Sequence, residues 1–382
     1  MKIQSIFQIP PRTTQQHEVL PFLHGIRFLA ILLLILLQAG DLLIQFLPAQ
    51  KLLPGVEFLS FLVSRGSVGF YVFFAVSGFA LSLPFAKGKP KENYMEYLKR
   101  KLYRILPPFL MVVTALAGLL LIKVDYSLAG LASHYLATIT FTYELFYGEH
   151  SVIFPLAWTL GVQVQFYLFL PILASGYFGI RSTAERRIAL IWTVFSLILF
   201  QHGIGWNLYP FKATLLGQIP HFLIGMLVAD LYQKPIKALQ KSYLWDIIFP
   251  FILIILALTG TEQLGKSLIF EIAVLLTFLS LIYGKIINRL VSSCGAFVFG
   301  AMSFSLYLIH MPVLKGFALI TVQVSQWTGL VGQLSILVMV AFPLILLFGL
   351  IVFRWIELPF IHRPMARQPS SNFVLAGSSQ RR

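Results

Sequence analysis

This sequence of 382 residues has little charge and almost no cysteine. Only 11% of its residues are charged, whereas 58% are hydrophobic, and the mean hydropathy is +0.83. Soluble domains carry about 25% charged residues, so the composition excludes an ordinary soluble domain and indicates a polytopic membrane protein. The single cysteine, Cys294, excludes an internal disulfide framework and argues against a thiol nucleophile or a cysteine-held metal.

The two ends of the chain differ from its middle. Residues 1–20 are polar and lack the apolar core and small-residue cleavage site of a signal peptide. We expect 1–21 to remain as a cytoplasmic N-terminal segment, 22–362 to form one transmembrane domain, and the polar stretch 363–382 to be a disordered cytoplasmic tail.

The middle of the chain contains apolar runs that are long enough to cross a hydrocarbon core of ~30 Å. Because loops too polar for a bilayer separate them, we predict an all-α membrane protein with about ten transmembrane helices and both termini in the cytoplasm. The runs are 22–44, 59–84, 105–123, 152–176, 188–205, 213–231, 245–260, 267–284, 297–321 and 331–353.

The net charge of +15 could suggest a nucleic-acid partner, but the basic residues lie in short clusters between the apolar runs. With a cytoplasmic N-terminus, 23 of the 29 Lys and Arg residues fall in or beside inner segments and 6 in or beside outer ones. Such a bias is the positive-inside pattern of membrane proteins. We therefore predict membrane lipid, not nucleic acid, as the partner of these charges.

The longest outer connection runs from residue 124 to residue 151. Within it, LAGLASHYLATITF is apolar enough for a short interfacial or re-entrant helix, and the whole connection puts titratable side chains at the outer surface. Those side chains are Asp125, His134, Glu144, Glu149 and His150. A structural lid is the favoured interpretation, and a catalytic role is the alternative.

The first apolar run contains one cation, Arg27, and one amide, Gln38. Eleven positions correspond to about three turns, so the two share a helix face roughly 16 Å apart. A charge inside a bilayer costs on the order of 3 kcal/mol and is usually placed where it faces a bundle interior. Either the pair is functional, or Arg27 extends to the headgroups and Gln38 binds a neighbouring helix.

Other runs also carry polar residues on one helix face. In the second, Gly69, Phe73 and Ser77 follow at i+4 steps, which favours close helix packing over a ligand passage. At the start of the third, Arg100 and Arg104 lie one turn apart, where they could grip phosphate or contact anionic lipid.

The fourth and ninth runs carry the remaining candidates. Gln163 and Tyr167 are one turn apart in the fourth run, with Trp158 just before them, and an unpaired amide in hydrocarbon is costly. In the ninth run, Ser303, Tyr307 and His310 follow i, i+4 and i+7, which predicts one polar stripe. His310 could move a proton near neutral pH, and a hydrogen-bonded interior histidine is the alternative.

Six segments, in this order, resemble the integral-membrane acyltransferase 3 family, which includes O-acetyltransferases of surface glycans. The resemblance covers residues 22 to about 362. The segments are HGIRFLAILLLILLQ, GFYVFFAVSGFALS, RKLYRILPPF, WTLGVQVQFYLFLP, SFSLYLIHMPV and RWIELPF.

The resemblance implies an enzyme of the bacterial inner membrane that moves an acyl group, usually acetyl, from cytoplasmic acetyl-CoA or another acyl-CoA to a hydroxyl of a glycan or lipid-linked sugar. It implies no bound cofactor or metal. Arg27 would contact the donor, Arg100 and Arg104 would line the entry for its phosphates, and His310 would belong to the polar core. The site-lining candidates are Ser77, Trp158, Tyr167, Ser303 and Tyr307.

The sequence departs from the family at two positions. Gln38 stands where the family has its first-helix histidine, and Gln163 stands where it has a glutamate. A glutamine cannot accept the proton of the acceptor hydroxyl, a contribution worth typically about 10²- to 10⁴-fold in rate. It can still orient the acceptor or donate to a developing oxyanion.

Two hypotheses follow from these departures. In the first, the protein is an active O-acyltransferase with His310, or an outer-loop group, as the base. In the second, it is catalytically silent and binds or passes acyl donor or glycolipid as a transport or scaffold protein. A secondary transporter is a third possibility, which the scarcity of acidic residues in the apolar runs and the lack of a repeat disfavour.

The charge pattern makes a testable prediction of topology. Cysteines placed singly at Lys89 and Glu149, in a Cys294→Ser background, should react with a membrane-impermeant maleimide from opposite faces of the membrane, Lys89 from the cytoplasm. Labelling of both positions from one face would contradict the predicted topology.

Overall fold

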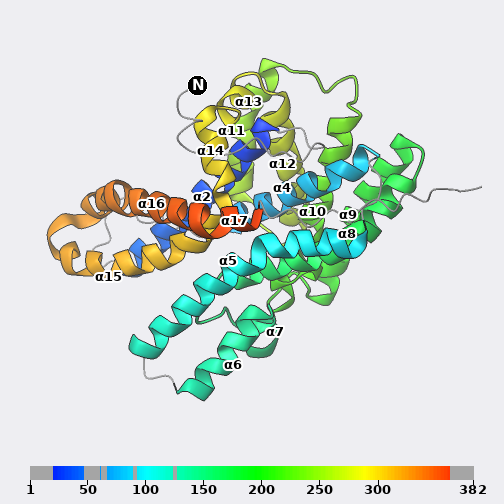
Figure 1. Ribbon diagram of the computed structural model, residues 1–382. Helices are drawn as coiled ribbons and strands as arrows, with labels where there is room; N and C mark the ends of the chain where they lie inside the picture. Colours follow the sequence, from blue (N-terminus) through cyan, green and yellow to red (C-terminus); the bar gives the residue numbers. More distant parts are fainter. Residues whose placement is uncertain (1–19, 47–60, 62–66, 89–92, 124–126, 362–382) are drawn as a thin grey trace, which may run out of the picture.

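The computed structural model describes residues 20–46, 61, 67–88, 93–123 and 127–361, and every regular element in these ranges is helical (Figure 1). In this part of the chain, eight helices are long and apolar enough to cross a membrane, or up to nine with one bent pair. The prediction of an all-α polytopic membrane protein is confirmed. Nearly all of segments 1–21 and 363–382 lies outside the described residues, so the side on which the termini lie stays a prediction.

The eight long helices follow the predicted runs in order. They are α2 (Pro21–Phe46), α4 (Ser67–Ala86), α5 (Tyr94–Lys123), α8 (Ala157–Gly179), α9 (Thr183–Ile204), α10 (Leu215–Gln233), α12 (Leu264–Tyr283) and the stretch Met339–Phe360. The last is built from η2 (Leu337–Ala341), α16 (Phe342–Val352), η3 (Phe353–Glu357) and α17 (Leu358–Ile361).

The other two predicted runs take different forms. Run 297–321 lies in α14 (Cys294–Ala301) and α15 (Ser303–Ile336), which are bent by 73° relative to each other. Run 245–260 is α11 (Tyr243–Leu258), whose 16 residues reach only roughly 24 Å at ~1.5 Å per residue. The predicted number of ten therefore counts one bent pair and one short helix as spans.

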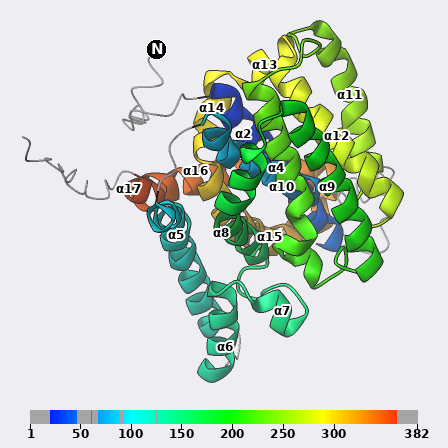
Figure 2. The ribbon, with the colours of Figure 1, turned by 90° about the vertical axis from the view of Figure 1, so that its right-hand side faces the viewer.

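Helices α4 and α10 form the centre of the bundle (Figure 2). In their apolar windows 72% and 78% of the residues are buried, against 22% in α9. A helix that is apolar around its whole circumference needs neighbours on all sides, and α4 is such a helix. Phe222 of α10 stacks on Phe74 of α4 at 5.1 Å and on Phe166 of α8 at 4.0 Å, between ring centroids.

Two glycines let α4 and α10 approach backbone to backbone. A Cβ on Gly78 would overlap the carbonyl of Phe222, and a Cβ on Gly225 would overlap the carbonyl of Ala75. On α4, Gly69 faces α2 in the same way, with an added Cβ 3.3 Å from the Ala30 carbonyl oxygen. Close helix packing, the favoured interpretation of this segment, is what the structure shows.

Helix α2 is fixed by further glycines against α13 (Ile286–Val291) and α14. A Cβ on Gly25 would overlap the backbone of Val291, and a Cβ on Gly300 would overlap the carbonyl of His24. Helix α2 also packs along α4 and α15. These contacts bring the polar residues of α2 within reach of three neighbouring helices.

A buried carboxylate joins the ends of α8, α9 and α10. Asp230 is fully buried and accepts hydrogen bonds from Arg186, from Nε of Arg187 at 2.8 Å and from the Tyr177 hydroxyl at 3.1 Å. Arg187 also donates to the Asp230 carbonyl at 3.1 Å and to that of Lys234 at 2.5 Å. Two guanidinium groups on one carboxylate satisfy a charge that would be costly alone.

The segment after α5 folds as α6 (Leu128–Ile139) and α7 (Tyr143–Tyr147), so the short helix predicted in this connection is present. The Ser127 hydroxyl caps α6 by accepting from the Gly130 amide at 3.1 Å. Tyr135 joins α6 to α5 through the Thr114 hydroxyl at 2.8 Å. The function of this segment as a lid stays a prediction.

The contact of α4 with α10 predicts a contrast between two glycine substitutions. Gly225→Ala should destabilise the protein by about 1–3 kcal/mol, because the added methyl collides with backbone that must shift. Gly118→Ala on α5 is the matched control, because nothing lies within 4 Å of its Cβ position. Thermal unfolding in detergent measures both, and equal stability of the two variants would contradict the close contact.

Candidate functional site

Two polar residues from distant parts of the chain meet inside the bundle. His310 of α15 is fully buried, and its Nε2 lies 2.7 Å from Oε1 of Gln38 on α2. The contact lies where α2 packs along α15 (Figure 1). The structure thus joins the predicted base, His310, to the predicted site residue Gln38.

Both ring nitrogens of His310 have partners. Nδ1 lies 3.1 Å from the carbonyl oxygen of Leu306. A neutral imidazole has one N–H and one acceptor nitrogen, so an N–H on Nδ1 leaves Nε2 to accept from the Gln38 NH₂ group. Rotating the Gln38 side-chain amide by a half-turn exchanges its nitrogen and oxygen, and this places the NH₂ group against Nε2 of His310. Nε2 is then the nitrogen that can take a proton, and Gln38 covers it.

Tyr307 connects the His310 helix to the start of α8. Its hydroxyl donates to the Leu156 carbonyl at 2.6 Å and also contacts the Thr159 hydroxyl. Its ring centroid lies 5.8 Å from that of His310. Ser303, the first residue of α15, is buried one turn before Tyr307.

Gln163 and Tyr167 lie one turn apart on α8, and both are buried. The Gln163 amide is close to the Tyr167 hydroxyl, but neither amide atom makes a hydrogen bond of normal geometry in the described part of the chain. The positive charges of Arg104 and Arg27 also interact electrostatically with this hydroxyl. Tyr167 on α8 is therefore within electrostatic range of one arginine from α5 and one from α2.

Glu357, which the sequence analysis used only as part of a motif, belongs to the same region. Its side chain is fully buried; Oε2 accepts from the Ser305 hydroxyl at 2.6 Å, and Oε1 lies 3.6 Å from Nη2 of Arg104. Arg104 is 34% exposed, so the carboxylate holds a guanidinium that still reaches solvent. The sequence signal that could have found this pair is an acidic residue beside an apolar run, because a charge in that position requires a partner.

The three predicted donor arginines have different surroundings. Arg27 is half-buried, and Arg27 and Arg104 share the neighbourhood of Tyr167. Arg100 lies one turn before Arg104 on α5 and is exposed. Arg27 and Arg104 both lie within electrostatic range of Tyr167, and Arg100 lies at the surface one turn before Arg104.

The remaining predicted residues lie on α8 and α4. Trp158 packs on Phe70 and Phe74 of α4, with ring centroids 5.4 and 6.1 Å away, and stacks on His150 at 6.2 Å. Ser77 is buried on α4, and within the described residues no hydrogen bond joins it to the other candidates. In the part of the chain that the structure describes, no group of three or more His, Cys, Asp or Glu side chains is placed to bind a metal ion.

Comparison with known proteins fits this arrangement. No curated protein and no solved structure matches the chain significantly. A family model described as an acyltransferase domain matches residues 20–355, which is most of the chain and contains every predicted site residue. The chain therefore belongs to the acyltransferase 3 family of membrane acyltransferases.

Proposed function

We propose that this protein is an O-acyltransferase of a bacterial inner membrane. It moves an acyl group, acetyl in the first instance, from cytoplasmic acyl-CoA to a hydroxyl of a surface glycan or lipid-linked sugar. Family membership supports acyl transfer, and the partly buried contact of 2.7 Å between His310 and Gln38 is the observation that supports the site.

In the proposed reaction, the acceptor oxygen attacks the thioester carbonyl. A C–O bond forms, the C–S bond breaks, His310 Nε2 takes the hydroxyl proton, and the CoA sulfur leaves and recovers a proton as the thiol. We assign the proton transfer to His310 because its Nδ1 is held by the Leu306 carbonyl, while its Nε2 faces the Gln38 amide, which an acceptor hydroxyl can displace.

Gln38 has a different part in this scheme from the histidine of the family pattern. When no acceptor is bound, the Gln38 amide is hydrogen-bonded to Nε2 of His310. The acceptor hydroxyl takes the place of this amide when it binds. The displaced NH₂ group can then donate to the carbonyl oxygen as negative charge develops. Gln38 thus orients the acceptor and stabilises charge without taking a proton.

The donor is proposed to bind at the arginines. Guanidinium groups pair with phosphate through two parallel hydrogen bonds, and Arg104 is oriented by the buried Glu357 carboxylate at 3.6 Å. Arg27 adds a second positive charge near Tyr167. Arg100 is exposed one turn before Arg104 and is proposed to contact the CoA phosphates that lie farther toward the surface.

A second candidate function is that of a silent family member that binds acyl donor or glycolipid. The observation in its favour is that Gln38 and Gln163 are both neutral and that Gln38 covers the accepting nitrogen of His310. The donor group of Arg27 and Arg104 would be the same under both functions. Activity of the purified protein distinguishes them.

Arg27 should contribute to donor binding. Arg27→Ala is expected to weaken binding of CoA by about tenfold to a hundredfold, the value of one charge-assisted hydrogen-bonded pair. Isothermal titration of the purified protein measures this. Lys266→Gln, which removes an exposed charge on the predicted outer side, is the control and should bind CoA normally; equal affinity in all three proteins would leave Arg27 as a membrane anchor.

His310 should carry the proton transfer. His310→Ala is expected to lower acetyl transfer by about 10²- to 10⁴-fold, and Gln38→Ala by about tenfold or less, because only the first removes a base. Transfer from labelled acetyl-CoA to a membrane glycolipid extract measures both. His202→Gln, on α9, is the control for a histidine outside the site.

The same assay tests the silent alternative. If wild-type protein shows no transfer above background while CoA still binds, the silent function is supported, and Gln38→His with Gln163→Glu should restore some transfer. Robust wild-type transfer that is insensitive to His310→Ala would contradict His310 as the base. The search would then move to His24, Asp41 and the outer titratable groups, of which Asp125 lies outside the described residues.

A further inference from the structure

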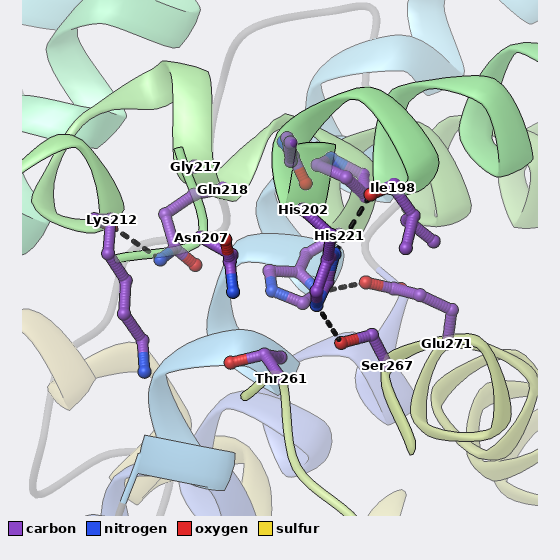
Figure 3. Close-up of a pocket in the computed structure, with 12 residues that line it drawn as sticks. Ile198, His202, Asn207, Lys212, Gly217, Gln218, His221, Thr261, Ser267 and Glu271 are labelled. Carbon is purple, nitrogen blue, oxygen red and sulfur yellow. Dashed lines mark hydrogen bonds and ion pairs between the residues drawn. The ribbon is translucent and has the colours of Figure 1, made fainter. Parts of the chain in front are cut away.

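A second polar site lies between α9, α10 and α12, away from His310 (Figure 3). Helix α4 separates the two, because Gly69 faces α2 whereas Tyr71, on the opposite face, stacks on His221 of α10 at 4.5 Å. The site surrounds a cavity of about 20 Å³. That volume holds about one water molecule or one hydroxyl group.

A histidine and a carboxylate form the inner wall of the cavity. His221 Nδ1 lies 2.6 Å from Oε1 of Glu271 on α12, and the two residues are only 2% and 5% exposed. The pair has an ion-pair distance, although Nδ1 makes no hydrogen bond of normal geometry within the described residues, and a neutral imidazole keeps one accepting nitrogen. The Tyr71 hydroxyl, 3.2 Å from the Thr261 hydroxyl, helps to hold the ring against which His221 stacks.

Two further acceptors in the wall have no partner in the described part of the chain. They are Oε1 of Gln218, a residue that is 1% exposed, and Oε2 of Glu271. The Gln218 amide is held in place because its Nε2 donates to the Lys212 carbonyl at 2.6 Å (Figure 3). A buried acceptor without a donor costs about 1–3 kcal/mol, so the wall is built for a ligand that brings O–H or N–H groups.

The entrance to the cavity adds further polar side chains. Asn207, Lys212 and Thr261 line it from the connections before α10 and before α12, which the charge pattern assigns to the outer side. The lining holds one basic residue, Lys212, and one acidic residue, Glu271, so side chains of both signs are present. Unpaired acceptors inside and polar side chains at the entrance are complementary to hydroxyl groups, which both donate and accept.

We propose that this cavity is a second binding site, separate from the His310 site, for a small neutral polyol. One hydroxyl enters past Lys212 and donates to Gln218 Oε1 or His221 Nε2, while the rest of the ligand remains at the entrance. The proposal does not depend on acyl transfer, because binding at His221 can be measured in a protein without any activity.

Chemical modification of His221 tests the proposal in the full chain in lipid nanodiscs. Diethyl pyrocarbonate modifies neutral imidazole nitrogen, and peptide mass spectrometry gives the rate at His221 relative to the half-exposed His150. Glycerol is the probe, and 1,2,3-trimethoxypropane, which has the same carbon skeleton without O–H groups, is its control. Glycerol at twice its Kd should slow modification of His221 about threefold, whereas the methylated compound should not.

Two variants assign the protection to the cavity wall. Gln218→Leu should abolish protection by glycerol, whereas Thr277→Val, a buried substitution on α12 outside the cavity, should retain it. If Gln218→Leu does not fold, Asn207→Ala at the entrance should still reduce the protection. Equal slowing by the methylated compound, protection that survives Gln218→Leu, or a His221 that does not react at all would each overturn the proposal.

Discussion

Polar side chains inside an apolar bundle must find their partners within the protein, because the surrounding hydrocarbon offers none. The described structure depends on this constraint at four places. His310 pairs with Gln38, Glu357 with Ser305 and Arg104, Asp230 with Arg186 and Arg187, and His221 with Glu271. Each set joins at least two different helices, so these polar residues link helices that the apolar packing brings together.

Close packing at α4 makes these pairings possible. Glycines at 69, 78 and 225 bring α2 and α10 against opposite sides of one central helix. The consequence is two polar regions with α4 between them, one built on α2, α8 and α15 and the other on α9, α10 and α12. Helix α4 separates the two regions because most of its side chains are apolar and its opposite faces pack against α2 and α10.

The two imidazoles differ in chemistry because their partners differ. Glu271 is a carboxylate whose Oε1 lies 2.6 Å from Nδ1 of His221, and both residues line a cavity. Gln38 is neutral, and its amide lies 2.7 Å from Nε2 of His310. This contact joins α2 to α15 without a charged partner.

The sequence by itself determined the helical membrane fold, the order of the apolar runs and most of the residues at the His310 site, because hydropathy and helical spacing are local properties. It also identified Gln38 and His310, although as separate candidates. Only the tertiary structure decided that they touch, that Glu357 holds Arg104, and that His221 and Glu271 share a cavity. Those contacts join residues dozens to hundreds of positions apart, and helix packing, which no local pattern encodes, selects them.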